Sequence, residues 1–122
     1  MLNIQILVGR IASKPVTKDV TSGDRTTKVT TFKLMTHEWY KGEEKEEAHD
    51  IEAWGEGLAK LLNGATSRLG DTIGFAGQTR HDSWKDAQDV WHNRTWCVID
   101  GNTKVALIAR SAKNKREPGE EG

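Results

Sequence analysis

The stretch at residues 73–96 limits most strongly what this 122-residue chain can fold into. It reads as two long β-rich runs on either side of a polar segment, Asp86, Ala87, Gln88 and Asp89. Polar turn residues between such runs favour a β-hairpin over a helix. We therefore expect an exposed hairpin in which Trp84 and Trp91, on either side of the turn, lie close together across the strands.

Aromatic residues are concentrated in this stretch. Trp84, Trp91 and Trp96 lie there among Lys85, His92 and Arg94. Tryptophan surrounded by charged residues is poorly placed for a hydrophobic core and well placed to stack on flat ligands that carry a charged backbone.

The rest of the chain limits the class of protein. Its length suits one domain, and its hydrophobic residues, 35% of the total, fall in ordered runs. The net charge of zero excludes a uniformly basic nucleic-acid binder. Basic residues dominate the first third and acidic residues dominate positions 43–56, so we expect a polyanion to bind one face only.

The start of the chain and its single cysteine indicate in which cellular compartment the protein works. Residues 1–10 have no basic region before the apolar residues, and Gln5 interrupts these, so we expect neither a signal peptide nor a membrane span. Cys97 excludes an intramolecular disulfide and a cysteine-based zinc site, and we expect it to be buried as a small hydrophobe. We therefore expect a cytoplasmic protein.

The N-terminal half predicts three strands. Residues 4–12 form the first, with apolar side chains partly buried on both faces and a bend at Gly9. Residues 26–37 form the second, with Thr30, Phe32 and Leu34 on one face, after a loop at residues 21–24. Residues 49–54 form a short third strand that turns Trp54 outward, after a charged loop that exposes Trp39 and Tyr40.

From Glu56 the spacing of the apolar residues changes. Leu58, Leu61 and Leu62 have helical spacing, so we expect a short helix from Glu56 to Gly64 that plugs one end of the fold. After the hairpin, an apolar run at residues 105–109 forms a last strand that closes or extends the sheet.

Three strands, a short helix and two more strands is the order of the five-stranded oligonucleotide- and oligosaccharide-binding (OB) barrel. The sequence resembles the bacterial single-stranded DNA-binding proteins over residues 1–108, in the segments MLNIQILVGRIASKP, TTFKLMTHEWYKG, IEAWGEGLAKLL, GDTIGFAGQTRHDSW and VIDGNTKVALI. The resemblance implies an all-β fold with one short helix, an OB-fold barrel with a long hairpin between its fourth and fifth strands. We expect the domain at residues 1–110 and a disordered polar tail at residues 111–122.

The resemblance also implies the binding residues. Bases would stack on Trp39 or Tyr40, on Trp54 and on Trp84, whereas Trp91, like Trp96, either adds a platform or packs across the hairpin. Arg80 occupies a basic position of the family. Further phosphate contacts are expected by position from Arg10, Lys14, Lys33, Lys41, Arg68 and Lys85.

The family pattern further implies a homotetramer without cofactor. This sequence departs from the pattern at positions that bear on DNA binding and on partner recruitment. Ala48 and Glu56 stand where the family commonly has a tryptophan and a lysine, which predicts weaker and less salt-sensitive binding. The acidic C-terminal tip ending in an aromatic is absent. Glu117, Glu120 and Glu121 are a poor substitute, so we do not expect recruitment of replication or repair proteins through such a tip.

Enzyme chemistry is not expected. His37, His49 and His81 each precede a carboxylate, but neighbours on a strand point to opposite faces and do not converge on one metal.

Two functions stay open. One is sequence-nonspecific binding that protects single-stranded DNA in replication, recombination and repair; the alternative, favoured by the acidic run, is a protein-interaction module in a replication or restart complex with weak nucleic-acid binding.

Overall fold

A computed structural model describes residues 2–63 and 69–109, which form one sheet and one short helix. The elements are β1 (Gln5–Ile11), β2 (Val16–Ser22), β3 (Arg25–Tyr40), β4 (Glu43–Trp54), α1 (Glu56–Asn63), β5 (Thr72–Lys85), β6 (Trp91–Ile99) and β7 (Ala106–Ala109). Arg68 and the tail expected at residues 111–122 lie outside the described residues. The described part of the chain holds no helix with the length and apolar character needed to cross a membrane.

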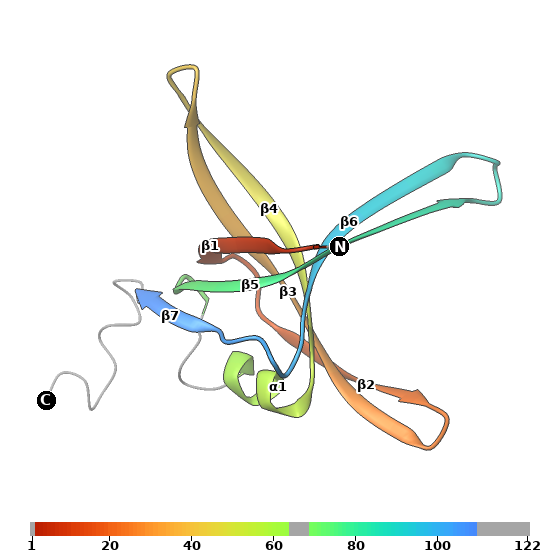
Figure 1. Ribbon diagram of the computed structural model, residues 1–122. Coiled ribbons are helices and arrows are strands. Elements are labelled where there is room, and N and C mark those ends of the chain that lie inside the picture. The colour runs from red at the N-terminus through yellow and green to blue at the C-terminus, as the bar shows by residue number, and fades with distance from the viewer. Residues whose placement is uncertain (1, 64–68, 110–122) are drawn as a thin grey trace, which may run out of the picture.

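The strand pairings form a closed circuit. The order is β1-β3-β4-β6-β5, and β5 pairs with β1 again, while β2 extends from β3 and β7 pairs with β5 (Figure 1). β1 pairs with β5 along most of its length and with β3 at its end, through Arg10 and Ile11. A Cβ on Gly9 would lie 2.5 Å from the carbonyl oxygen of Met35, so glycine allows β3 to approach β1 where the circuit closes.

The core lies inside this circuit. Thr30, Phe32 and Leu34 are all buried on one face of β3, as their alternation predicts, and Ile51 and Ala53 of β4 are buried beside them. Leu58 and Leu62 of α1 join the same core. Cys97 is also buried, and burial raises the pKa of its thiol, which keeps it protonated and unreactive at neutral pH.

The charged segment after Trp39 and Tyr40 is not a loop. It forms β4, whose first residue Glu43 pairs with Tyr40, so β3 and β4 make one long hairpin. The turn holds Lys41 and Gly42, which both have positive φ, as in the tight turns that match the twist of paired strands. The expectation of a loop was wrong because residues 43–50 have no alternating apolar residues that would indicate a strand. The pairing of β4 with β3 follows from the tight turn instead.

The segment after Pro15 also forms a strand that the sequence did not predict. β2 pairs with β3 from Val16 to Ser22, and Gly23 with a φ of 62° makes the turn between them. Most of β2 is exposed, so it lacks the apolar pattern from which strands are recognised. Across the two strands the ammonium of Lys28 on β3 bonds to Asp19, which lies opposite it on β2, at 3.0 Å, and this contact raises the pKa of Lys28.

The central stretch pairs antiparallel as β5 and β6, but in a register that separates its tryptophans. The turn occupies residues 86–90, so Lys85 lies opposite Trp91 and Trp84 lies opposite His92. Trp84 and Trp91 therefore project from opposite faces, and the expected contact between them is wrong. A turn of five residues instead of four shifts the register by one and reverses the face of every β6 side chain.

The first strand is apolar on both faces but buried on only one. Leu7 and Ile11 lie in the core, whereas Ile4, Ile6 and Val8 are 54–73% exposed, which corrects the expectation of partial burial on both sides.

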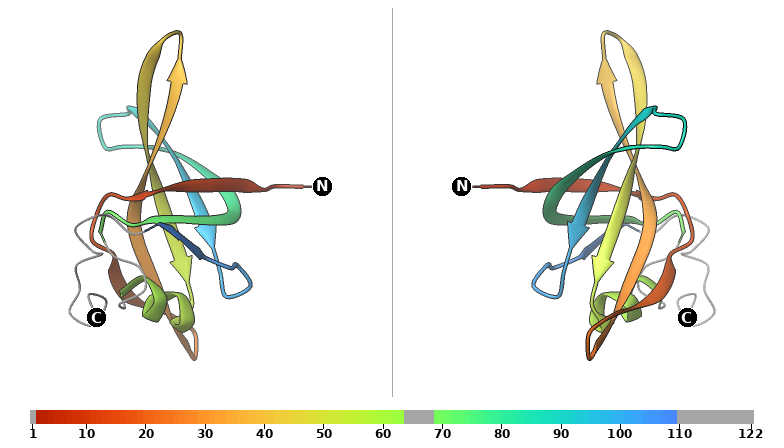
Figure 2. Two further views of the ribbon diagram at one scale, coloured as in Figure 1. Left: turned by 90° about the vertical axis from the view of Figure 1, so that its left-hand side faces the viewer. Right: turned by 90° about the vertical axis from the view of Figure 1, so that its right-hand side faces the viewer.

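The tips of the β3–β4 and β5–β6 hairpins extend away from the end of the molecule that holds α1 (Figures 1 and 2).

Candidate nucleic-acid interface

Four of the five tryptophans project from one face of the sheet. In β3 and β4 the buried pair Phe32 and Ile51 marks the inner face, and Trp39 and Trp54 alternate away from it. In β5 and β6 the buried Cys97 marks the inner face, and Trp84 and Trp96 alternate away from it. The outer face thus carries Trp39, Trp54, Trp84 and Trp96, whereas Tyr40 and Trp91 project from the other face.

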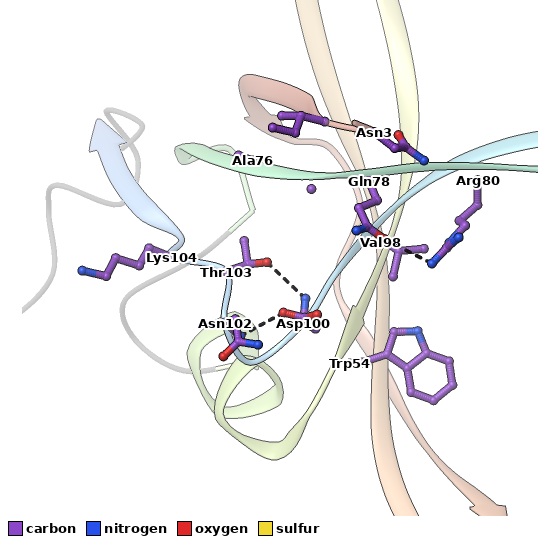
Figure 3. Close-up of a pocket in the computed structure, with 12 residues that line it drawn as sticks. Asn3, Trp54, Ala76, Gln78, Arg80, Val98, Asp100, Asn102, Thr103 and Lys104 are labelled. Atoms are coloured by element: carbon purple, nitrogen blue, oxygen red, sulfur yellow. Dashed lines mark hydrogen bonds between the residues drawn. The ribbon is translucent and has the colours of Figure 1, made fainter. Parts of the chain in front are cut away.

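Trp54 lies in a groove of about 620 Å³ between β4, β5 and the turn after β6. Arg80 lines the same groove, and Figure 3 shows both side chains beside Val98 of the intervening strand. The indole Nε1 of Trp54 donates to Glu52 at 2.7 Å, which fixes the ring. The guanidinium of Arg80 donates to the neutral Gln78 at 3.1 Å, and no carboxylate among the described residues forms an ion pair with it.

A second depression of about 400 Å³ gathers basic residues on the outer face. Lys14, Lys33 and Arg94 line it. The ammonium of Lys33 lies 2.8 Å from Asp50. Because both side chains are exposed, this ion pair is worth about 0–1 kcal/mol and a phosphate can replace the carboxylate at little cost.

Basic side chains also lie over three aromatic rings, of which Tyr40 and Trp91 are exposed and Trp96 is partly buried. Arg94 lies 4.4 Å from the ring centre of Trp96, Lys85 lies 5.2 Å from that of Trp91, and Lys41 lies 5.4 Å from that of Tyr40. Such cation–π pairs place a positive charge beside each aromatic surface. Of these three rings only Trp96 lies on the outer face, because Tyr40 and Trp91 project from the other face.

The structure separates the predicted phosphate contacts into two groups. Arg80, Lys14 and Lys33 line the outer-face depressions. Arg10 is exposed on β1, Lys41 lies at the tip of the β3–β4 hairpin, and Lys85 is paired with Asp89 at 3.2 Å on the face opposite Trp84. These three residues line neither depression.

Sequence reasoning missed Gln78, Arg94 and Lys104 as lining residues. Gln78 lies two residues before Arg80 on β5, and Arg94 lies two residues before Trp96 on β6. Counting in steps of two from each predicted site residue would therefore have identified Gln78 and, with the correct register, Arg94. Lys104 follows the turn at residues 101–103, and no periodicity of the chain indicates its place.

A group of possible metal ligands lies on the β3–β4 hairpin. The Nδ1 atom of His37 lies 2.9 Å from Glu44 and 3.4 Å from Glu46, and among the described residues this is the set of three such groups that converges. The carboxylates come from the opposite strand and not from Glu38, the residue that follows His37 in the chain. All three side chains are exposed, and the imidazole of His37 lies within ion-pair distance of both carboxylates.

Comparisons with known proteins agree with this geometry. A solved structure from Plasmodium falciparum, described as SSB in complex with ssDNA, matches with a TM-score of 0.75 and 23% identity over 88% of this chain and 96% of that one. The mitochondrial single-stranded DNA-binding protein Rim1 of S. cerevisiae matches with a TM-score of 0.66 and 15% identity over 91% of this chain and all of that one. At such identities the two matches show a shared fold.

No curated protein gives a significant match to the sequence. The sequence pattern of the single-strand binding protein family, however, matches residues 2–107, which is most of the chain. The chain therefore belongs to the single-strand binding protein family.

Proposed function

We propose that this chain binds single-stranded DNA without sequence preference, by stacking bases on outer-face tryptophans and by contacting phosphates with the basic residues between them. The observation that carries the proposal is the placement of Trp39, Trp54, Trp84 and Trp96 on one face of the sheet. The family consists of DNA-binding proteins that are not enzymes, so the chain binds its ligand without transforming it.

Stacking accounts for the lack of sequence preference. Every base has a π-face, and each aromatic platform contributes about 1–3 kcal/mol whichever base it meets. Arg80, Lys14, Lys33 and Arg94 lie between or beside the platforms and supply the contacts to the sugar-phosphate backbone. Stacking and charge together favour a single strand, because a duplex hides its base faces.

The closed circuit of pairings supports a five-stranded OB barrel for the domain. β1, β3, β4, β5 and β6 form the circuit, and β5 and β6 continue beyond it as the long hairpin that carries Trp84. OB barrels commonly bind oligonucleotides across the strands of one face. The groove with Trp54 and Arg80 lies between β4 and β5, across β6.

We further propose that the chain acts as a homotetramer that protects single-stranded DNA in replication, recombination and repair. The exposed face of Ile4, Ile6 and Val8 is apolar, and a second copy is the occupant that the family membership favours. The region of β4 around His49 is a further candidate contact. Four linked sites raise the effective concentration along one strand, which compensates for modest affinity at each site.

A protein-interaction module is the second candidate. The β3–β4 hairpin exposes Glu43, Glu44, Glu46 and Glu47 on its two faces, and these carboxylates repel DNA and suit a basic protein partner. On this account the chain would bind single-stranded DNA only weakly.

Fluorescence anisotropy separates the two candidates. A labelled oligo(dT) should bind the purified chain, and an excess of unlabelled single strand should displace it while the same amount of duplex should not. Equal competition by duplex, or no binding of the label at moderate salt, would exclude the proposed function and favour the interaction module.

A further inference from the structure

The Trp84 ring does not stand alone on the β5–β6 hairpin. It stacks on the imidazole of His92, which lies directly opposite it, with ring centres 5.5 Å apart and planes 20° from parallel. Trp84 keeps 44% of its surface exposed. His92 thus lies against one side of the indole, and nearly half of the Trp84 surface stays exposed to a ligand.

His92 is in turn held by the hairpin turn. Its Nε2 lies 2.7 Å from Oδ2 of Asp86, and this hydrogen bond is the main reason why the pKa of Asp86 is lowered. The other carboxylate oxygen, Oδ1, accepts bonds from the backbone N–H groups of Gln88 and Val90 at 2.9 and 3.0 Å. One carboxylate thus fixes both the turn and the imidazole.

We infer that Asp86 and His92 are positioning residues that hold Trp84 as a one-sided stacking platform for a single base. This inference rests on the proposed function. Asp86 holds His92, His92 holds the ring of Trp84, and the open face of that ring accepts one base. Without His92 the indole would be free to rotate about its side-chain bonds, and binding would have to pay the entropy of ordering it.

The experiment measures affinity for oligo(dT) in the full chain and in the variants His92→Ala, His92→Phe and Asp86→Asn. His92→Ala should weaken binding about two- to tenfold, the range expected from the loss of one aromatic pair. His92→Phe restores a flat ring beneath Trp84 and should recover most of the affinity. Asp86→Asn keeps the oxygen that accepts the backbone bonds of the turn but weakens the bond to His92. Its loss of affinity should therefore be smaller than that of His92→Ala.

His81→Ala is the matched control. His81 lies on the same hairpin, bonded to Thr95 at 2.9 Å, but on the face opposite Trp84. Its removal should leave the affinity unchanged. Circular dichroism and thermal unfolding of each variant check that the hairpin and the domain still fold.

A double-mutant cycle decides the mechanism. His92→Ala should have no effect when Trp84 is already alanine, because the imidazole then has no ring to hold. The inference is overturned if His92→Ala weakens binding equally in both backgrounds, if His92→Phe fails to recover affinity, or if His81→Ala has the same effect. A parent chain that binds no oligo(dT) would instead overturn the proposed function itself.

Discussion

Trp54 and Arg80 line the same groove although they belong to β4 and β5, with β6 between them. An aromatic ring and a guanidinium that has no ion pair within the described residues thus face one groove across three strands (Figure 3). A nucleotide needs both kinds of contact, one for its base and one for its phosphate. The two residues can be tested separately because aromatic and ionic contacts respond differently to salt.

Trp54→Ala should weaken binding of oligo(dT) by about 1–3 kcal/mol at every salt concentration, because it removes a stacking platform and leaves the phosphate contacts in place. Titrations at several salt concentrations measure the effect. Trp91→Ala is the control, since Trp91 projects from the opposite face, and it should have a smaller effect. Equal losses in the two variants would contradict the assignment of the binding face.

Arg80→Ala should lower affinity mainly at low salt. Each phosphate contact to a single strand contributes about 0.7 to the slope of log affinity against log salt, so the slope should flatten by roughly that amount. Lys60→Ala, on the exposed surface of α1, should leave the slope unchanged. A slope that stays the same in Arg80→Ala would remove Arg80 from the phosphate contacts.

Gly77→Ala should destabilise the fold. A Cβ at this position would lie 2.7 Å from both the sulfur of Cys97 and the carbonyl oxygen of Val98, so β5 and β6 would have to separate. Overpacking of this kind costs about 1–3 kcal/mol of unfolding free energy, measured by urea denaturation. Gly57→Ala meets no atom within 4 Å and lies in α1, so it should stabilise the fold by about 0.5–1 kcal/mol.

Ile6→Asp should dissociate the proposed tetramer, because it places a charge in the exposed apolar face of β1. Light scattering at micromolar concentration measures the mass. Val20→Asp changes an exposed apolar residue on β2 and should leave the mass unchanged. A parent chain with the mass of a monomer would contradict the tetramer directly.

The inner and outer faces of β3 and β4 could be predicted from the sequence because their central residues alternate. Thr30, Phe32 and Leu34 are buried, Ile51 and Ala53 face them, and Trp54 lies on the opposite face. Alternation reports burial wherever one face of a strand meets the core. It says little about β2 or the first half of β4, which are exposed on both faces.

The register of β5 and β6 could not be predicted in the same way. Near the turn both faces of the hairpin are exposed, so no buried residue marks which side chains share a face. The register depends on whether the turn has four or five residues, and Asp86 settles this through its bonds to Gln88 and Val90. That single difference moves Trp91 away from Trp84 and places His92 against it.

The most direct test of the account is the intrinsic tryptophan fluorescence of the chain during titration with oligo(dT) and with duplex DNA. Stacked bases quench indole fluorescence, and four of the five tryptophans lie on the proposed binding face. The account predicts strong quenching by oligo(dT) and little change with duplex. Equal quenching by both, or none by oligo(dT) under conditions in which the strand is bound, would contradict base stacking as the basis of binding.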